Sequence, residues 1–179
     1  MSYHQNKFPE RWDYFPIDWK DNNKIPPLTI REAAPSDTYA ISVIEKSHEE
    51  PGASLKRIYR WITTSLYSVW VAVRNHRHVT GYVVAKHDPV TRQSTILRIY
   101  VHPEARRQKI ATRLMAMVSF EQPEYSLRVT RNFEEAYELE GFFRSLGFKR
   151  DDKFSNEDDK DLSSFTLASR IAGLKPPAE

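Results

Sequence analysis

Cysteine is absent from this chain of 179 residues. Its absence excludes disulfide bonds, a thiolate nucleophile and a cysteine-ligated zinc site. The chain also has no apolar run near the ~20 residues that a membrane-spanning helix needs. Residues 1–20 contain no apolar segment of the kind found in a secretory signal. We therefore expect a cytoplasmic protein that does not enter a membrane.

The charge balance is close to neutral, with 27 basic residues, 24 acidic residues and a net charge of +3. Hydrophobic residues make up 40% and charged residues 28% of the chain, as in an ordinary globular domain. The length fits one domain that can bury a core. Because the basic residues are scattered along the chain, its composition does not favour a nucleic-acid-binding protein.

Residues 1–27 are polar overall but carry many aromatic side chains: Phe8, Trp12, Tyr14, Phe15 and Trp19. Disordered tails are usually poor in aromatic residues. We predict an arm that packs on its own domain, with packing on a partner as the alternative.

Residues 97–117 combine a strand, a basic turn and a helix. The run up to Val101 is dense in β-branched and aromatic residues, and Pro103 ends it because proline has no N–H to donate. Apolar residues at helical spacing then predict a helix over Arg107–Phe120. The polar side chains at its start are Arg106, Arg107, Gln108 and Lys109. Unpaired N–H groups and the helix dipole favour a phosphate or pyrophosphate there, and a solvated basic turn is the alternative.

Two motifs resemble those of the GNAT superfamily of acyl-CoA-dependent N-acyltransferases. The segment VHPEARRQKIATRLM is similar to the coenzyme A signature of that family, which reads Arg or Gln, two residues, Gly, one residue, then Gly or Ala. Arg106 takes the first position and Ala111 the last. Lys109 stands where the family usually has its first glycine, which lets the backbone approach the pyrophosphate. We expect a helical Lys109 that still offers its N–H.

The second motif is Phe143–Phe148, FRSLGF, which resembles the aromatic-x-x-Leu-Gly-Phe ending of the fourth helix in that family. The two motifs occur in the family's order, with a strand-like segment between them. The resemblance covers about Leu28 to Arg170. It divides the chain into an arm (1–27), an N-acetyltransferase domain (28–170) and a C-terminal tail (171–179).

The resemblance implies an α/β (α+β) fold of three layers. A mixed central sheet of about seven strands is expected with four helices, and strands four and five are parallel and splayed apart. The strands predicted from the residue pattern are Leu28–Glu32, Val69–Val73, Val79–Lys86, Thr95–Val101, Tyr125–Arg131, Phe148–Phe154 and Leu162–Ala168. The predicted helices start at Pro35–Asp37, cover Leu55–Leu66 and Arg107–Phe120, and end with Asn132–Leu146.

The resemblance also implies acetyl-CoA as co-substrate, with no metal. The pantetheine arm would pair with the backbone of strand four at Ile99, Tyr100 and Val101. The pyrophosphate would lie on the turn and helix start, formed by Arg106, Arg107, Gln108, Lys109, Ile110, Ala111 and Thr112. Asn132 and Phe143 complete the implied set, and for Asn132 a helix cap is the alternative.

The positions where the family often carries its acid or base hold residues that cannot serve: Thr95, Leu97, Arg128 and Phe143. Two replacements are His102, which titrates near neutrality when unperturbed, and Tyr137 on the last helix. The alternative for His102 is a solvent-exposed turn residue, and the alternative for Tyr137 is packing.

The function implied is an N-acetyltransferase that moves acetyl from acetyl-CoA to a primary amine by direct attack. No acyl-enzyme forms, so the missing cysteine does not exclude it. The acceptor stays open among a small amine, a lysine and a protein N-terminus, and a homodimer also stays open. The alternative is a catalytically weak acyl-CoA-binding module or partner subunit, and a basic nucleic-acid binder ranks last.

Overall fold

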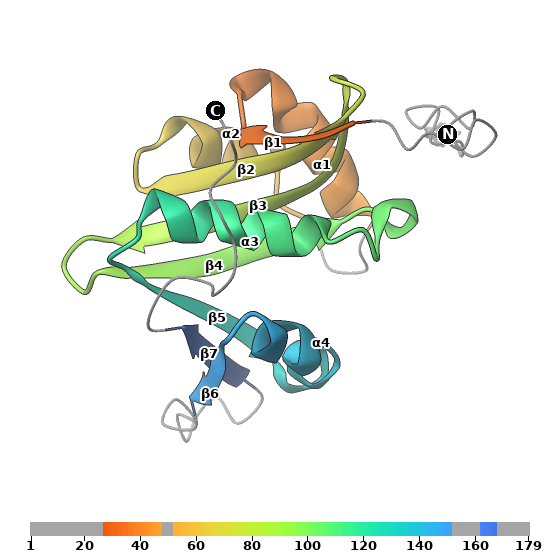
Figure 1. The fold of residues 1–179 in the computed structure, drawn as a ribbon. Coiled ribbons are helices and arrows are strands. Elements are labelled where there is room, and N and C mark those ends of the chain that lie inside the picture. Colours follow the sequence, from red (N-terminus) through yellow and green to blue (C-terminus); the bar gives the residue numbers. More distant parts are fainter. Residues whose placement is uncertain (1–26, 48–51, 152–161, 168–179) are drawn as a thin grey trace, which may run out of the picture.

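A computed structural model describes residues 27–47, 52–151 and 162–167 (Figure 1). Of these, residues 130–138, 151 and 162–164 are described by their backbone alone. Residues 1–26 of the predicted arm and the predicted tail, 171–179, lie outside the described residues.

A helix pair follows the first strand, three consecutive strands come next, and helices then separate the fourth strand from the fifth and the fifth from the sixth. The strands are β1 (Leu28–Glu32), β2 (Tyr67–Arg74), β3 (His78–Asp88), β4 (Gln93–Val101), β5 (Ser126–Asn132), β6 (Lys149–Asp151) and β7 (Leu162–Leu167). The helices are α1 (Thr38–Lys46), α2 (Leu55–Thr63), α3 (Ile110–Glu121) and α4 (Phe133–Ser145), with short 3-10 turns η2 (Pro35–Asp37) and η3 (Pro103–Ala105). Within the described ranges, none of these helices is both long and apolar enough to cross a membrane.

The seven strands form one sheet in the order β1-β2-β3-β4-β5-β7-β6. The β4–β5 pair is parallel and the other neighbours are antiparallel. The predicted mixed sheet of seven strands, with its antiparallel meander and one parallel crossover through α3, is therefore confirmed.

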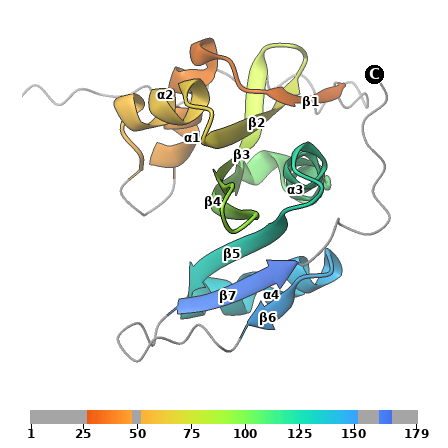
Figure 2. The same ribbon diagram turned by 90° about the vertical axis from the view of Figure 1, so that its left-hand side faces the viewer.

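Helices cover both faces of the β2–β4 meander, α1 and α2 on one face and α3 on the other (Figure 2). On the first face, Ile41, Ile44 and Ile58 pack against Val71 and Val84 of the sheet. This packing fixes the α1–α2 pair against β2 and β3.

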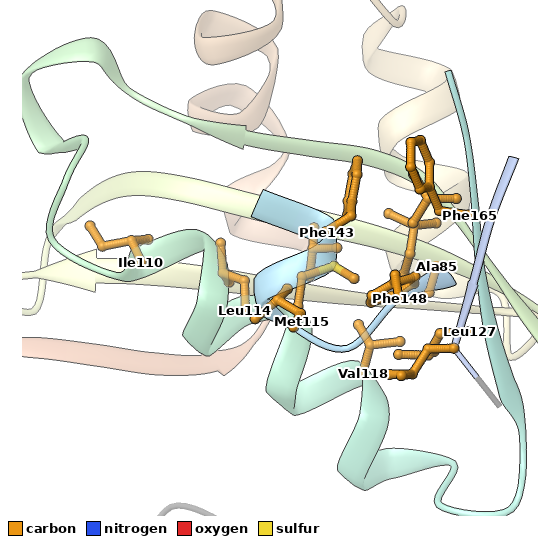
Figure 3. Close-up of a cluster of buried hydrophobic side chains, with 14 of the residues drawn as sticks. Ala85, Ile110, Leu114, Met115, Val118, Leu127, Phe143, Phe148 and Phe165 are labelled. Carbon is orange, nitrogen blue, oxygen red and sulfur yellow. The ribbon is translucent and has the colours of Figure 1, made fainter. Parts of the chain in front are cut away.

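The second core lies between α3, α4 and the other face of the sheet (Figure 3). The side chains labelled in that view are Ala85, Ile110, Leu114, Met115, Val118, Leu127, Phe143, Phe148 and Phe165. Ile110, the first residue of α3, is 2% exposed. Its burial fixes the start of α3 directly after the turn that follows β4.

Local turn chemistry agrees with the prediction at two places. Asn75 and His76 have φ of 50° and 58°, and the N–H of Arg77 donates to the carbonyl of Arg74 at 3.1 Å. Such a turn matches the twist of the β2–β3 hairpin. Gly147 has φ of 90° and ends α4, as expected of a C′ glycine.

Strands β2 and β4 each begin two residues earlier than predicted, at Tyr67 and Gln93, and three predicted helix boundaries were wrong. The third helix begins at Ile110 and not at Arg107, because residues 107 and 109 have positive φ, which a right-handed helix excludes. The second helix ends at Thr63, since Thr64 is extended with φ of −111° and ψ of 125°. Asn132 is the last residue of β5, and α4 begins after it.

A buried histidine joins three strands away from these turns. The Nδ1 of His87 lies 2.8 Å from the hydroxyl of Ser94, and its Nε2 lies 2.9 Å from the hydroxyl of Ser68. Both serines are buried. A neutral imidazole satisfies both contacts by donating from one nitrogen and accepting at the other. Burial lowers the pKa of His87, while the carboxylate of Glu121 acts weakly in the opposite direction.

We predict that the free energy of unfolding falls as the pH drops below about 6.5, the ordinary histidine pKa. In that range His87 binds a proton in the unfolded chain, whereas its lowered pKa keeps it neutral in the folded protein. The slope contributed by each such histidine is at most about 1.4 kcal/mol per pH unit. Urea unfolding at pH 7.5 and 5.5 measures how the free energy of unfolding depends on pH. His87→Asn should reduce the pH dependence, whereas the exposed-turn variant His76→Asn should keep it; equal slopes in both variants would contradict the assignment.

Candidate active site

Strand β4 carries a bulge at Leu97. Arg98 pairs with Val84 of β3 and Ile96 pairs with Ala85, so Leu97 is one extra residue in β4. A bulge bends its strand and increases the local twist. Strand β4 therefore changes direction at Leu97.

The parallel pairing of β4 with β5 stops at this bulge. It joins residues 93–96 to residues 126–129, and β5 then continues to Asn132 paired with β7 on its other side. From Leu97 to Val101, the edge of β4 that faces β5 has no strand paired to it in the described part of the chain. The two strands diverge in the same place in Figure 1. The predicted splay is confirmed, and Ile99, Tyr100 and Val101 lie along it.

The turn after β4 holds two residues in the left-handed region. Arg107 has φ of 64° and Lys109 has φ of 59°. Lys109 is the N-cap of α3, with no side-chain capping bond. The N–H groups of the first turn of α3, at Ile110, Ala111 and Thr112, have no acceptor inside the helix. A helix start of this kind, rimmed by basic residues, suits an anion.

Two side chains of this turn are already held in place. Gln108 accepts a hydrogen bond from Arg74 of β2 through its amide oxygen. The Nε of Arg106 donates to the carbonyl of Val101 at 3.3 Å. Burial, and after it the nearby charge of Arg113, lower the pKa of the Arg74 guanidinium. Like charges thus converge on the start of α3, and an anion bound there would relieve their repulsion.

His102 is buried, and so the alternative of a solvent-exposed turn residue was wrong. It is 6% exposed and its Nδ1 accepts a hydrogen bond from the N–H of Glu104 at 3.3 Å. That bond caps η3 and places the ring proton of the neutral form on Nε2. Burial lowers the pKa of His102, which keeps the imidazole neutral at pH 7. A neutral imidazole can accept a proton, and its catalytic role stays a prediction.

Comparison with known proteins now identifies the fold. The family model of the acetyltransferase (GNAT) domain matches residues 65–150, from the start of β2 to β6. Residues 65–150 are thus similar to a GNAT acetyltransferase domain, and this similarity indicates an acyltransferase, as the two motifs did. No curated protein matches the chain by sequence.

Solved GNAT structures share the architecture at low sequence identity. The ribosomal-protein-S18-alanine N-acetyltransferase from Escherichia coli matches with a TM-score of 0.62 and 17% identity, over 86% of this chain and 99% of that one. NAA60 from Arabidopsis thaliana, in complex with acetyl-CoA, matches with a TM-score of 0.61 and 15% identity, over 79% and 98%. A GNAT-family protein from Desulfovibrio desulfuricans reaches a TM-score of 0.65 at 15% identity, over 79% and 99%. At these identities the matches show the fold.

The backbone is left-handed at the glycine position of the GNAT-like signature, although the residue there is lysine. Lys109 occupies the glycine position and adopts φ of 59°, a conformation that costs a residue with a β-carbon about 1–2 kcal/mol. The expectation of a helical Lys109 was therefore wrong. The departure changes the side chain at this position while the turn remains left-handed.

Other predicted residues lie in different surroundings. Phe143 is fully buried, with its ring 5.2 Å from Phe165 and 5.6 Å from Phe148, so packing accounts for its place. Asn132 pairs with Leu162 at the end of β5, which fits either a ligand contact or a helix cap. Tyr137 lies within α4, where only the backbone is described. The cofactor contacts predicted for these residues stay predictions.

A buried carboxylate beside the bulge was missed. Glu45 of α1 is 2% exposed. It accepts hydrogen bonds from the N–H of Ala53 at 2.6 Å and from the hydroxyl of Tyr82, and one of its oxygens lies 3.7 Å from the Nε of Arg98. Burial, and then the Glu45 carboxylate, raise the pKa of Tyr82, so its hydroxyl stays protonated. One feature of the sequence could have indicated the site: Glu45 lies four residues after Ile41, on the apolar stripe of α1.

Replacing Lys109 separates its backbone role from its side chain. Lys109→Gly should raise the free energy of unfolding by about 1 kcal/mol, because glycine adopts positive φ without strain. Lys109→Ala, the matched control, keeps the β-carbon and should give no such gain. Thermal unfolding of both variants measures the effect. An equal change in the two would show that the left-handed turn stores no strain.

Proposed function

We propose that this chain transfers an acetyl group from acetyl-CoA to a primary amine by direct attack of the amine on the thioester. The observation that carries the proposal is the continuity of two features. The edge of β4 from Leu97 to Val101 has no strand paired to it in the described residues. Only His102 and the short turn η3 separate it from the basic left-handed turn at the start of α3. Coenzyme A has the same two parts, an extended amide-bearing arm and a pyrophosphate.

The chain would bind these parts mainly through its backbone. The peptide groups of Ile99, Tyr100 and Val101 pair with the amides of the arm, as a neighbouring strand would. The N–H groups from Lys109 to Thr112 and the cations of Arg106 and Arg107 hold the pyrophosphate. No group of three or more His, Cys, Asp or Glu side chains suited to a metal occurs among the described residues. The proposed binding assigns no contact to a metal.

The reaction needs the carbonyl to be polarised and the amine to be neutral. A β4 N–H close to the bulge donates to the thioester oxygen, where negative charge develops in the transition state. The amine nitrogen forms a bond to the carbonyl carbon, the carbon–sulfur bond breaks, and coenzyme A leaves as a thiolate. The amine gives its proton to a base or to water.

His102 and Tyr137 are the side chains proposed to move that proton. His102 is neutral at pH 7, but it lies three residues beyond Ile99, which is about 10 Å along an extended strand. Its proton transfer therefore needs a water chain. Tyr137 would act as the acid that protonates the leaving thiolate.

The alternative function is an acyl-CoA-binding module or partner subunit with little turnover. Thr95 and Leu97, beside the proposed thioester site, carry no acid or base, and that observation favours the alternative. The two functions differ in one result: a module binds acetyl-CoA and releases no thiol in the presence of amines.

Calorimetric titration with acetyl-CoA, followed by free CoA, tests the binding site. Micromolar binding and thiol release with at least one amine would support the enzyme. Micromolar binding with no release across a panel of peptides, lysine derivatives and polyamines would support the module. Absence of binding would contradict both.

Arg107→Glu should weaken acetyl-CoA binding by at least tenfold, because it reverses a charge beside the pyrophosphate. Arg92→Glu is the matched control. Arg92 also has positive φ, 50°, and it lies in the turn before β4, at the opposite end of that strand from residue 107. Calorimetry should show the control binding as wild type does. If the two variants bind acetyl-CoA equally, the pyrophosphate does not lie on the turn at residues 106–109.

A further inference from the structure

Arg98 occupies the first position after the β4 bulge, and its side chain lies on the face covered by α1. Its backbone pairs with Val84, which packs in the core under α1 and α2. Its guanidinium reaches Glu45 of α1. The basic turn at residues 106–109 lies at the other end of the same unpaired edge. A co-substrate whose phosphates lie at that turn would therefore present its reactive end close to Arg98.

The guanidinium of Arg98 is only partly used by the protein. Its Nη1 donates to the carbonyl of Leu97 at 3.1 Å. Its Nε is buried and has no hydrogen-bond partner in the described structure, because Glu45 at 3.7 Å is too distant for a hydrogen bond. The side chain is 30% exposed. A guanidinium has five N–H donors in a planar fork, so the two terminal nitrogens have donors besides the one that bonds Leu97, and a ligand can use these.

Glu45 holds this group in position. Both of its oxygens already accept hydrogen bonds, from Ala53 and from Tyr82, and the guanidinium of Arg98 lies beside it. Those contacts hold the carboxylate in one orientation and occupy both of its oxygens. A buried ion pair is weak support for stability and is better explained as a device that fixes geometry. Glu45 is thus a positioning residue for Arg98.

We propose that Arg98 binds the oxygen of a carbonyl or carboxylate carried next to the acceptor amine, so that the acceptor is the α-amino group of a peptide or amino acid. This inference rests on the proposed function. A planar cationic fork suits such an oxygen and disfavours a second cation in contact with it, which disfavours a polyamine as the acceptor. A lysine side chain has no carbonyl near its amine for Arg98 to bind.

The missing acid–base residues point to the same class of acceptor. At pH 7.5 an α-amine, with a pKa of about 7.7–8.0, is roughly one quarter to two fifths neutral, whereas lysine, with a pKa of about 10.4, is roughly 0.1% neutral. A site whose nearest positions are Thr95 and Leu97 has no side chain there to deprotonate a lysine. An α-amine needs that help far less. The guanidinium of Arg98 and the absence of an acid or base at Thr95 and Leu97 are two independent reasons to expect an α-amine as the acceptor.

The test compares alaninamide with isopropylamine, which has the same branched amine without the carboxamide. Thiol release gives kcat/KM for each amine with wild type, Arg98→Met and Arg92→Met, the last being a control in the turn before β4. Arg98→Met should lower kcat/KM for alaninamide at least tenfold more than for isopropylamine, mainly through KM. Arg92→Met should preserve the wild-type preference. Alanine and a short peptide amide, assayed in parallel, distinguish a free amino acid from a peptide.

Measuring the acetyl-CoA dissociation constant of each variant separates a failure of the Arg98 proposal from a failure of the proposed function. Normal acetyl-CoA binding with an equal loss for both amines, or with no loss, would overturn the role of Arg98 while leaving the acetyltransferase intact. Acetylation of a lysine side chain or polyamine in preference to alaninamide would do the same. Failure to bind acetyl-CoA in wild type would overturn the proposed function itself, and this inference with it.

Two further variants keep the proposal testable: one addresses misfolding of Arg98→Met, and the other tests the positioning role of Glu45. If Arg98→Met does not fold because Glu45 loses its counter-charge, the double variant Glu45→Gln/Arg98→Met removes both charges and carries the same comparison. Glu45→Gln alone should raise KM for alaninamide while kcat changes little, since it loosens Arg98 without touching the reacting atoms. A loss confined to kcat would contradict a positioning role.

Discussion

The bulge at Leu97 is the constraint on which the candidate site depends. Without the extra residue, β4 and β5 would keep their parallel pairing to the ends of both strands, and the sheet would have no free internal edge. With it, β4 bends away after Ile96, and within the described residues the β5-facing edge from Leu97 to Val101 has no strand paired to it, while the other edge stays paired with β3. Unpaired peptide groups inside a sheet are costly unless a ligand or water satisfies them. The fold thus provides a place for an extended, amide-bearing molecule before any side chain is considered.

The packing of α3 supplies the second half of this arrangement. Ile110, Leu114 and Met115 lie in the core, so the helix cannot shift along its axis to relieve the turn that precedes it. Arg107 and Lys109 therefore stay at positive φ, although neither is glycine. Core burial offsets the local strain and holds the start of α3 directly after the turn that follows β4.

Much of this could be predicted from local patterns, because they reflect short-range physics. The strand positions follow from runs of β-branched and aromatic residues, the antiparallel meander follows from the short turns, and the hairpin at Asn75 follows from turn chemistry. The start of α3 could not be predicted, since Lys109 has a good helix propensity that the core overrides. The burial of His102 and the pairing of Glu45 depend on which strands and helices meet in space. Those tertiary contacts cannot be deduced from the local residue pattern of a single sequence.

Charge explains why the two ends of the unpaired edge would act differently on a ligand. At the turn, Arg106 and Arg107 are exposed and compete with water and salt, so they suit a multiply charged phosphate group. At the bulge, Arg98 is partly buried against Glu45, and the pair is close to neutral from a distance. Such a pair exerts little long-range attraction and acts only on atoms that touch it. The turn would therefore contribute affinity for the co-substrate, and Arg98 would contribute selectivity among acceptors.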